Sequence, residues 1–324
     1  METWYRSVLE VLKFCSPQGV LGCAAINQVW SKAADSQEIW ACLCEAEIAF
    51  SSTEHPKVTY RKWSYAQGIL VHAKSASMRM FDCRKREWSP VVTLSVNIEV
   101  TFCSSAVLLA DIRLLLCGGV DLGVRDSQCS GCAYILDLNG SVTSLEPLNV
   151  SRANHALIEV YRAVYVFGGM TRGRMGKSVG TSERISSPFV RKNWEILPEM
   201  TEPHFGFNPC KVREVIYLCG KIKFQVFIQS FNTFSLEFSN LHILLESTVQ
   251  QQMCLFLHQG HLVVLQTKRL AVIDLVQKQV LSDQEHNGAF ANGVMNPVLT
   301  GSRLCHLDYV SGRIFTFDLS TALA

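Results

Sequence analysis

One short pattern recurs along residues 66–324 and limits what this part of the chain can fold into. An apolar residue precedes Asp or Asn, and a second large or apolar residue stands seven positions after the first, as in Phe81-Asp82 with Trp88. The pattern returns at intervals of about 42–55 residues, which is typical of an array of repeated supersecondary units. Its other copies are Leu136-Asp137 with Thr143, Ser187 with Trp194 (where the Asp is lost), Phe231-Asn232 with Phe238, Ile273-Asp274 with Val280, and Phe317-Asp318.

A second pattern, an apolar run that ends in glycine, precedes the first pattern in several copies. It is clearest at residues 114–119, 164–169 and 216–220, which read Leu-Leu-Leu-Cys-Gly-Gly, Val-Tyr-Val-Phe-Gly-Gly and Ile-Tyr-Leu-Cys-Gly. An unbroken apolar run of this length predicts a strand that is buried on both faces. The glycines then predict a tight exit from the strand, where neighbouring units crowd the backbone.

Together the two patterns resemble kelch repeats, in which a strand and a double glycine precede an aromatic-Asp strand and a tryptophan. The resemblance covers residues 66–324 and implies a mainly β fold, a six-bladed kelch-type β-propeller with the tryptophan packed between blades. The last blade is expected to lack its outer strand, because the sequence stops soon after Phe317-Asp318. Residues 58–63 could supply that strand; alternatively, residues 57–67 form a helix between two domains.

Residues 1–50 follow a helical pattern instead. Apolar residues at positions 8, 9, 11 and 12 predict a short buried helix, and Ser16-Pro17 combines an N-cap with a first helical proline. A second apolar stripe follows over residues 20–30, and Asp35 or Ser36 would cap a third helix. Three short helices enclose a very small core, so such a unit needs a partner or a neighbouring domain for stability.

This segment closely resembles an F-box. The resemblance rests on two leucine-type helices, on Val29-Trp30, and on an acidic stretch before Ile39-Trp40 and Leu43-Cys44. The family's opening Leu-Pro is absent, and Trp4-Tyr5 stands near that place. The resemblance implies binding to a Skp-family adaptor and, through it, to a cullin–RING ubiquitin ligase. By matching positions, it implies an adaptor-binding set of Val8, Leu9, Leu12, Pro17, Val20, Leu21 and Ile26, and an F-box core of Val29, Trp30, Ile39, Trp40 and Leu43.

The sequence therefore divides into an F-box-like helical domain at residues 1–50, a linker at 51–65 and a propeller at 66–324. In the alternative interpretation, residues 1–50 only cap the propeller and bind no adaptor.

Composition excludes several function classes. The 324 residues carry 30 Lys and Arg against 28 Asp and Glu, and a net charge of +2 gives no general attraction to nucleic acid or to an anionic membrane. No apolar run reaches the roughly 18 residues of a membrane span, and no secretory signal is recognised. The 13 cysteines are therefore interpreted as free thiols in a reducing compartment, the cytoplasm, with the nucleus as an open alternative.

Few residues point to chemistry. Cys129 and Cys132 form a single CxxC pair, whereas a structural metal site needs four ligands. No Ser-His-Asp set, carboxylate pair or nucleophilic cysteine is recognised, so no catalytic residue, metal or cofactor is predicted. A long basic loop near residues 170–184 fits an acidic or phosphorylated peptide; in the alternative interpretation it is a solvated insertion without a ligand. The substrate-binding candidates in it are Arg172, Arg174, Lys177 and Arg184.

The combined resemblance implies a non-catalytic substrate-recognition subunit of a Skp–cullin–F-box ubiquitin ligase. Its helices would bind the adaptor, and its propeller loops would hold a target protein near the ubiquitin-loaded enzyme. Two other classes stay open. One is a kelch scaffold for cytoskeletal or signalling proteins, and the other is a propeller enzyme with a metal in its central channel.

Overall fold

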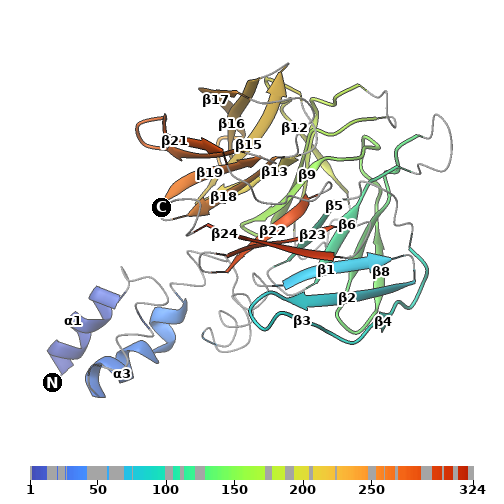
Figure 1. Ribbon diagram of the computed structural model, residues 1–324. Helices are drawn as coiled ribbons and strands as arrows, with labels where there is room; N and C mark the ends of the chain where they lie inside the picture. Colours follow the sequence, from blue (N-terminus) through green and yellow to red (C-terminus); the bar gives the residue numbers. More distant parts are fainter. Residues whose placement is uncertain are drawn as a thin grey trace. The chain divides into compact units, whose positions relative to one another are not determined.

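The computed structural model divides the chain into two compact units, Met1–Gln67 and Gly68–Ala324. The first unit is helical and the second is built of strands (Figure 1). No described helix is long and apolar enough to cross a membrane. The structure describes residues 2–12, 20, 26, 28–41, 57, 69–74, 76–98, 105–109, 113–120, 128–171, 177–186, 193–203, 207–222, 225–246, 253–258, 260–266, 269–285, 294–300, 303–308 and 313–319.

The helical unit contains α1 (Glu2–Leu12) and α3 (Gln28–Ala34), which contact each other. The chain is helical again over residues 37–41. Ser36 begins this last helix, because its Oγ accepts a hydrogen bond from the Ile39 backbone N–H at 3.3 Å. The predicted cap is thus confirmed at Ser36. Trp40 Nε1 donates to the Ala34 carbonyl at 2.7 Å and fixes the last helix against the end of α3.

The strands of the second unit form six sheets, and the first three follow one another along the chain. Their strands pair antiparallel. Blade 1 has β1 (Ile69–Lys74), β2 (Ser77–Asp82), β3 (Glu87–Trp88) and β4 (Val92–Thr93); blade 2 has β5 (Ser105–Leu108), β6 (Leu114–Cys117), β7 (Ala133–Leu136) and β8 (Val142–Leu145); blade 3 has β9 (Ala156–Val160), β10 (Ala163–Phe167), β11 (Ser182–Ser186) and β12 (Glu195–Leu197).

The remaining three sheets continue the same order, with one exchange between neighbours. The short β13 (Phe207–Asn208) precedes the strands of blade 4 but pairs parallel with β18 of blade 5. Blade 4 has β14 (Cys210–Val212), β15 (Val215–Ile222), β16 (Gln225–Asn232) and β17 (Glu237–Glu246); blade 5 has β18 (Met253–His258), β19 (His261–Gln266), β20 (Arg269–Asp274) and β21 (Gln279–Glu285); blade 6 has β22 (Val294–Thr300), β23 (Arg303–Asp308) and β24 (Arg313–Asp318).

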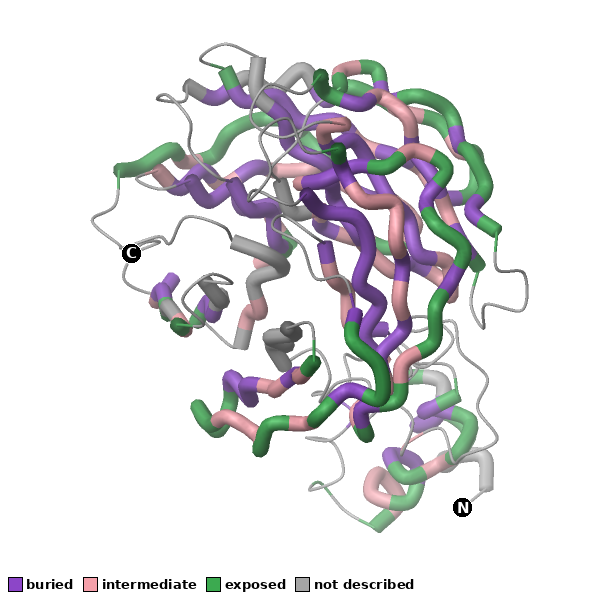
Figure 2. The backbone as a smooth tube through the Cα atoms, turned by 90° about the vertical axis from the view of Figure 1, so that its right-hand side faces the viewer, coloured by how far each residue is buried: buried purple, intermediate pink, exposed green. Residues whose placement is uncertain are grey.

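The six sheets close into a ring. The first strand of each sheet contacts that of the next from β5 through β9, β14, β18 and β22, and β22 in turn contacts β1. Blades 1 and 2 share an apolar cluster that includes Met78 and Leu116. Buried segments run along the strands, whereas turns and the outer strand β21 are exposed (Figure 2). The predicted mainly β, six-bladed propeller is therefore confirmed.

The recurring Asp or Asn forms the same turn between β2 and β3 of blade 1, between β16 and β17 of blade 4 and between β20 and β21 of blade 5. Asp82 Oδ1 accepts hydrogen bonds from the backbone N–H groups of the residues two and three positions later. Asn232 and Asp274 accept the equivalent bonds. Such side chains stabilise turns by replacing a backbone acceptor. The turn leaves four residues between the strands, so positions seven apart, such as Phe81 and Trp88, become cross-strand partners.

Blade 2 departs from this spacing. Leu136 pairs with Val142, and Thr143 pairs with Ile135. Cross-strand partners beside this turn are therefore six positions apart instead of seven. The reason is a shorter turn, in which Gly140 has a φ of 93° and closes the connection one residue earlier. In blade 3, Ser187 lies outside the described residues, and Trp194 packs in one cluster with Ile185.

The aromatic residue that follows the repeat's turn packs against the preceding blade. Trp194 of blade 3 donates from Nε1 to the Glu146 carbonyl, beyond the end of blade 2, at 2.9 Å. Phe238 of blade 4 meets Phe167 of blade 3 edge-on, with ring centroids 6.0 Å apart. Trp88 of blade 1 packs with Cys305 of blade 6. The aromatic residue of the repeat thus lies between blades, as expected.

The double glycines are required by both conformation and space. Gly118 and Gly169 have φ values of 66° and 99°. A Cβ on Gly118 would lie 2.4 Å from the Arg152 carbonyl oxygen and 2.5 Å from His155 Cε1. The segment that enters blade 3 therefore crosses directly over the corner of blade 2, and only glycine fits there.

Blade 6 has three strands among the described residues, β22 to β24, whereas the neighbouring blades have at least four. Residues 58–63, the predicted source of an outer strand for this blade, lie outside the described residues. Lys57 is described as helical and forms an ion pair with Asp35 inside the helical unit.

We expect Gly118→Ala to destabilise the propeller by about 3 kcal/mol or more, because it adds a steric overlap to a strained φ. Gly260→Ala is the matched control. Gly260 also has a positive φ, 81°, but no atom lies within 4 Å of its Cβ position. That control should cost only about 1–2 kcal/mol from backbone strain. Urea unfolding of both variants measures the difference, and equal losses would contradict the crossing at Gly118.

Candidate interaction surface

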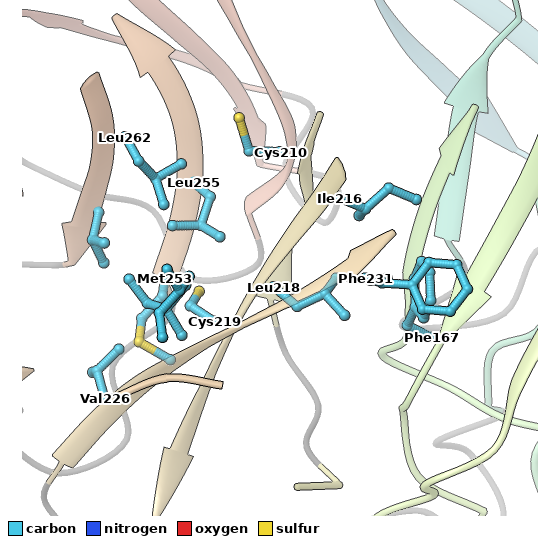
Figure 3. Packing of buried hydrophobic residues seen from close by; sticks show 14 of the residues in the cluster. Phe167, Cys210, Ile216, Leu218, Cys219, Val226, Phe231, Met253, Leu255 and Leu262 are labelled. Carbon is cyan, nitrogen blue, oxygen red and sulfur yellow. The ribbon is translucent and has the colours of Figure 1, made fainter. Parts of the chain in front are cut away.

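Blades 3 and 4 share an aromatic core that reaches their turns. Phe167 of β10 and Phe231 of β16 face each other in the interior, with ring centroids 5.2 Å apart (Figure 3). Phe231 also packs on its cross-strand partner Phe238 at 4.7 Å. Aromatic pairs at these distances are stabilising. They fix the β16–β17 turn beside the β9–β10 turn.

The two turns bring a pair of rings to the surface. Tyr161 of the β9–β10 turn stacks on Phe234 of the β16–β17 turn, with centroids 5.6 Å apart and planes 10° from parallel. Phe234 is 74% exposed. Lys211 Nζ lies 5.4 Å from the centroid of the Tyr161 ring, within cation–π range. Tyr161, Phe234 and Lys211, with Arg162 and Arg213 in the adjacent turns, are called the aromatic turn surface below.

The backbone under this surface is strained. Tyr161 and Arg162 form the two-residue connection of β9 to β10 and have φ values of 47° and 61°. Asn-Gly is the favoured pair in such a turn, since larger side chains pay about 1–2 kcal/mol at each left-handed position. Arg213, with a φ of 56°, is strained in the same way. Strain of this kind concentrates at functional positions.

Lys177 of the predicted basic substrate-binding set lies on the other face of the propeller. It belongs to the β10–β11 connection, whereas the antiparallel order puts the β9–β10 and β16–β17 turns at the opposite strand ends. Lys177 is exposed there, and Arg172 and Arg174 lie outside the described residues. Arg184 lies within β11 and makes a two-pronged ion pair with Glu195 of β12, at 2.7 and 3.2 Å.

The side chain of Arg152 donates five hydrogen bonds inside the propeller. Its guanidinium is fully buried and donates to the carbonyls of Val150, Gly168 and Thr181, to Thr181 Oγ1, and to Glu183 Oε1 at 2.6 Å. Glu183 in turn accepts hydrogen bonds from the backbone N–H groups of Asn149 and Val150. The network joins the segment that leaves blade 2 to the corner and third strand of blade 3, a structural role.

His155 lies beside this network and meets a cysteine. Its Nε2 is 3.3 Å from Cys117 Sγ, and both side chains are buried. Burial lowers the pKa of His155 to about 3, helped by the Arg152 charge. Burial raises the pKa of the Cys117 thiol well above its usual range. The pair is therefore neutral, whereas a nucleophilic cysteine needs a thiolate beside a histidine that accepts its proton.

The remaining chemical candidates stay apart. Cys129 Sγ donates to the Met170 carbonyl at 3.1 Å, and burial raises its thiol pKa, while Cys132 is half-buried. His258 and His261 are cross-strand partners at the β18–β19 turn. Among the described residues, no group of three His, Cys, Asp or Glu side chains could hold a metal ion.

In the helical unit, the adaptor-binding and core candidates differ in how far they are buried. Val8, Leu9, Leu12 and Val20 are buried, as are Ile39 and Trp40, whereas Val29 and Trp30 are half-buried. Ile26 and Val11 are 59% and 53% exposed. Pro17, Leu21 and Leu43 lie outside the described residues. The exposed apolar side chains of this unit are thus Val11 and Ile26 among the residues that the structure describes.

No protein-family model matches this sequence, and no curated protein sequence matches it significantly.

Sequence patterns alone missed the aromatic turn surface. Tyr161 directly follows a β strand and Phe234 follows the recurring Asn232, so both positions were recognisable as turns. Their contact was not, because it joins turns of two blades. Large side chains, rather than Asn-Gly, in the two-residue turn at 161–162 were the one available signal.

We expect removal of the buried Arg152 to lower the free energy of unfolding far more than removal of the partly exposed Arg184. Arg152→Ala leaves Glu183 charged and buried, which should cost about 3–5 kcal/mol. Arg184 directly follows Glu183 in β11 and pairs with Glu195 at a partly exposed position. Arg184→Ala breaks that pair and should cost about 1 kcal/mol or less. Chemical denaturation at pH 7 compares the two variants. Similar losses of unfolding free energy in the two variants would contradict this prediction.

His155 should make stability depend on pH between 6.5 and 3. Its pKa is lowered in the folded state, so below pH 6.5 the unfolded chain binds a proton that the folded chain does not. Stability should therefore fall as the pH falls, by about 2 kcal/mol between pH 6.5 and 5. Denaturation midpoints of wild type and His155→Gln over this range isolate the effect, because the variant lacks the group. Equal slopes would refute it.

Proposed function

We propose that this chain is the substrate-recognition subunit of a Skp–cullin–F-box ubiquitin ligase, with F-box-like helices that bind the adaptor and a kelch-type propeller that binds the target. The observation that carries the proposal is the division into a small helical unit and a six-bladed propeller. A propeller of this kind fits a protein-interaction scaffold. The sequence resemblance of residues 1–50 supports the ligase role for the helical unit.

The helical unit supports an interface of limited size. Its apolar residues exceed what its own interior covers, since Val11 and Ile26 remain more than half exposed. Buried Val8, Leu9 and Leu12 hold α1 in place beneath them. An adaptor contact needs apolar side chains that are accessible, and these two are the large exposed ones among the described residues of the unit. We therefore assign the adaptor contact to Val11 and Ile26 rather than to the buried set.

The propeller supports target binding on the aromatic turn surface. Aromatic and basic side chains are enriched where proteins bind one another, and Phe234 offers a nearly free ring on a rigid turn. Lys177 on the opposite face marks a second possible contact region. Catalysis by this chain is not required, because holding a target near the ubiquitin-loaded enzyme raises its effective concentration.

The adaptor contact can be tested with the full chain co-expressed with a Skp-family adaptor. Wild type should co-purify with the adaptor through affinity and size-exclusion steps. Val11→Asp/Ile26→Asp should reduce binding at least about tenfold, because charges replace exposed apolar contacts. Gln37→Asp is the matched control, since it places one charge at an exposed polar position of the same unit and should leave binding unchanged.

A folded wild type that binds no adaptor would contradict the ligase role and leave an interaction scaffold without ubiquitin chemistry. Circular dichroism of each variant separates lost binding from lost folding. Equal binding by the double variant and wild type would mean that the adaptor contacts other residues.

A further inference from the structure

The contact between the first and last blades contains two cysteines. Cys83 directly follows β2 of blade 1, and Cys305 lies in β23 of blade 6. Both belong to one buried cluster with Phe81, against which three half-buried residues pack. We call this cluster the closing seam; it consists of Phe81, Cys83, Trp88, Val298, Cys305 and Ile314.

Both cysteines are buried within the closing seam. Cys83 is 5% and Cys305 is 2% exposed. Cys305 and burial together raise the pKa of the Cys83 thiol far above its usual range. Neither cysteine forms a disulfide in this structure. Two buried cysteines, one from the first blade and one from the last, thus lie in one apolar cluster.

The seam lacks the backbone ties that two other blade boundaries have. Blades 4 and 5 are tied by the parallel pairing of β13 with β18. Blades 2 and 3 are tied through Arg152, whose backbone hydrogen-bonds to Gly119 and Ser130 of blade 2 and whose side chain hydrogen-bonds to blade 3. Among the described strands, none of blade 1 pairs with one of blade 6. Closure there rests on the contacts of β1 with β22 and β23 and on the closing seam itself.

We propose that Cys83 and Cys305 are a redox modification site, at which a small-molecule disulfide such as oxidised glutathione joins the first and last blades covalently. The inference does not depend on the proposed ligase function. The thiolate of one cysteine attacks oxidised glutathione, forms a mixed disulfide and releases one glutathione thiolate. The second cysteine thiolate then attacks the mixed disulfide and releases the other. The protein loses two protons and two electrons, and oxidised glutathione becomes two thiols.

Burial controls when this reaction occurs. Only a thiolate attacks a disulfide, and the closed seam keeps the Cys83 thiol protonated and both thiols covered. The reaction therefore proceeds from molecules whose seam has opened. Once formed, the bond closes a loop of about 220 residues, which restricts the unfolded chain strongly. Oxidation thus converts a seam held by packing into a covalently closed ring.

The test uses the reduced full chain, incubated with glutathione buffers of increasing oxidised fraction at several temperatures below unfolding. Free thiols are then alkylated, and disulfide-linked peptides are identified by non-reducing mass spectrometry. We expect a Cys83–Cys305 linked peptide, and a melting temperature at least about 5 °C above that of the reduced protein. Cys83→Ser and Cys305→Ser should each lose both effects. Cys129→Ser, which alters the more accessible CxxC pair, should keep both.

Mapping in wild type needs no variant, so a serine variant that fails to fold leaves the test intact. The proposal is wrong if Cys83 becomes alkylated while no Cys83–Cys305 peptide forms under oxidation. It is also wrong if only glutathione adducts appear, or if Cys83→Ser retains the rise in melting temperature.

Discussion

The propeller depends on the close approach between the segment that enters one blade and the corner of the blade before it. At the boundary of blades 2 and 3, this approach is held by the side chain of Arg152. Its five guanidinium N–H groups have five acceptors, spread over the incoming segment, the glycine corner of β10 and the third strand of blade 3. The planar, forked guanidinium can hold three segments at once, which the single ammonium of a lysine cannot. The same crossing leaves no room for a side chain at Gly118. The buried hydrogen bonds of Arg152 and the close backbone approach at Gly118 therefore depend on each other at this boundary.

Local chemistry explains why much of the fold was predictable. The recurring Asp or Asn works within its own turn, by accepting two backbone hydrogen bonds, and the aromatic residue seven positions on is then brought opposite by the turn itself. Neither step needs knowledge of the rest of the chain, so six blades could be inferred from spacing. Blade 2 differs at Leu136, where a glycine shortens the turn and the cross-strand partner is Val142. A fixed interval cannot anticipate such a change of turn type.

Sites were less predictable than blades, because they depend on which surfaces meet. An apolar pattern in α1 identifies residues that avoid water, but not which of them face the interior, and Val11 lies outside while Leu12 lies inside. The basic set near residues 170–184 was defined by charge alone, yet Arg184 belongs to a strand and is bound to Glu195 across the register. Tyr161 and Phe234 are 73 positions apart and meet only because blades 3 and 4 are neighbours.

The aromatic turn surface and the closing seam lie at different blade boundaries of the ring. In a ring of six blades, the boundary between blades 3 and 4 lies opposite the boundary between blades 6 and 1. The first boundary has an aromatic core beneath the aromatic turn surface, and it is joined to blade 5 through β13 and β18. The second has the closing seam and no backbone pairing among the described strands. Because local opening begins where the fewest interactions must break, the seam should open before the aromatic turn surface is disturbed. A disulfide between Cys83 and Cys305 would therefore change how often the ring opens and leave the aromatic turn surface unchanged.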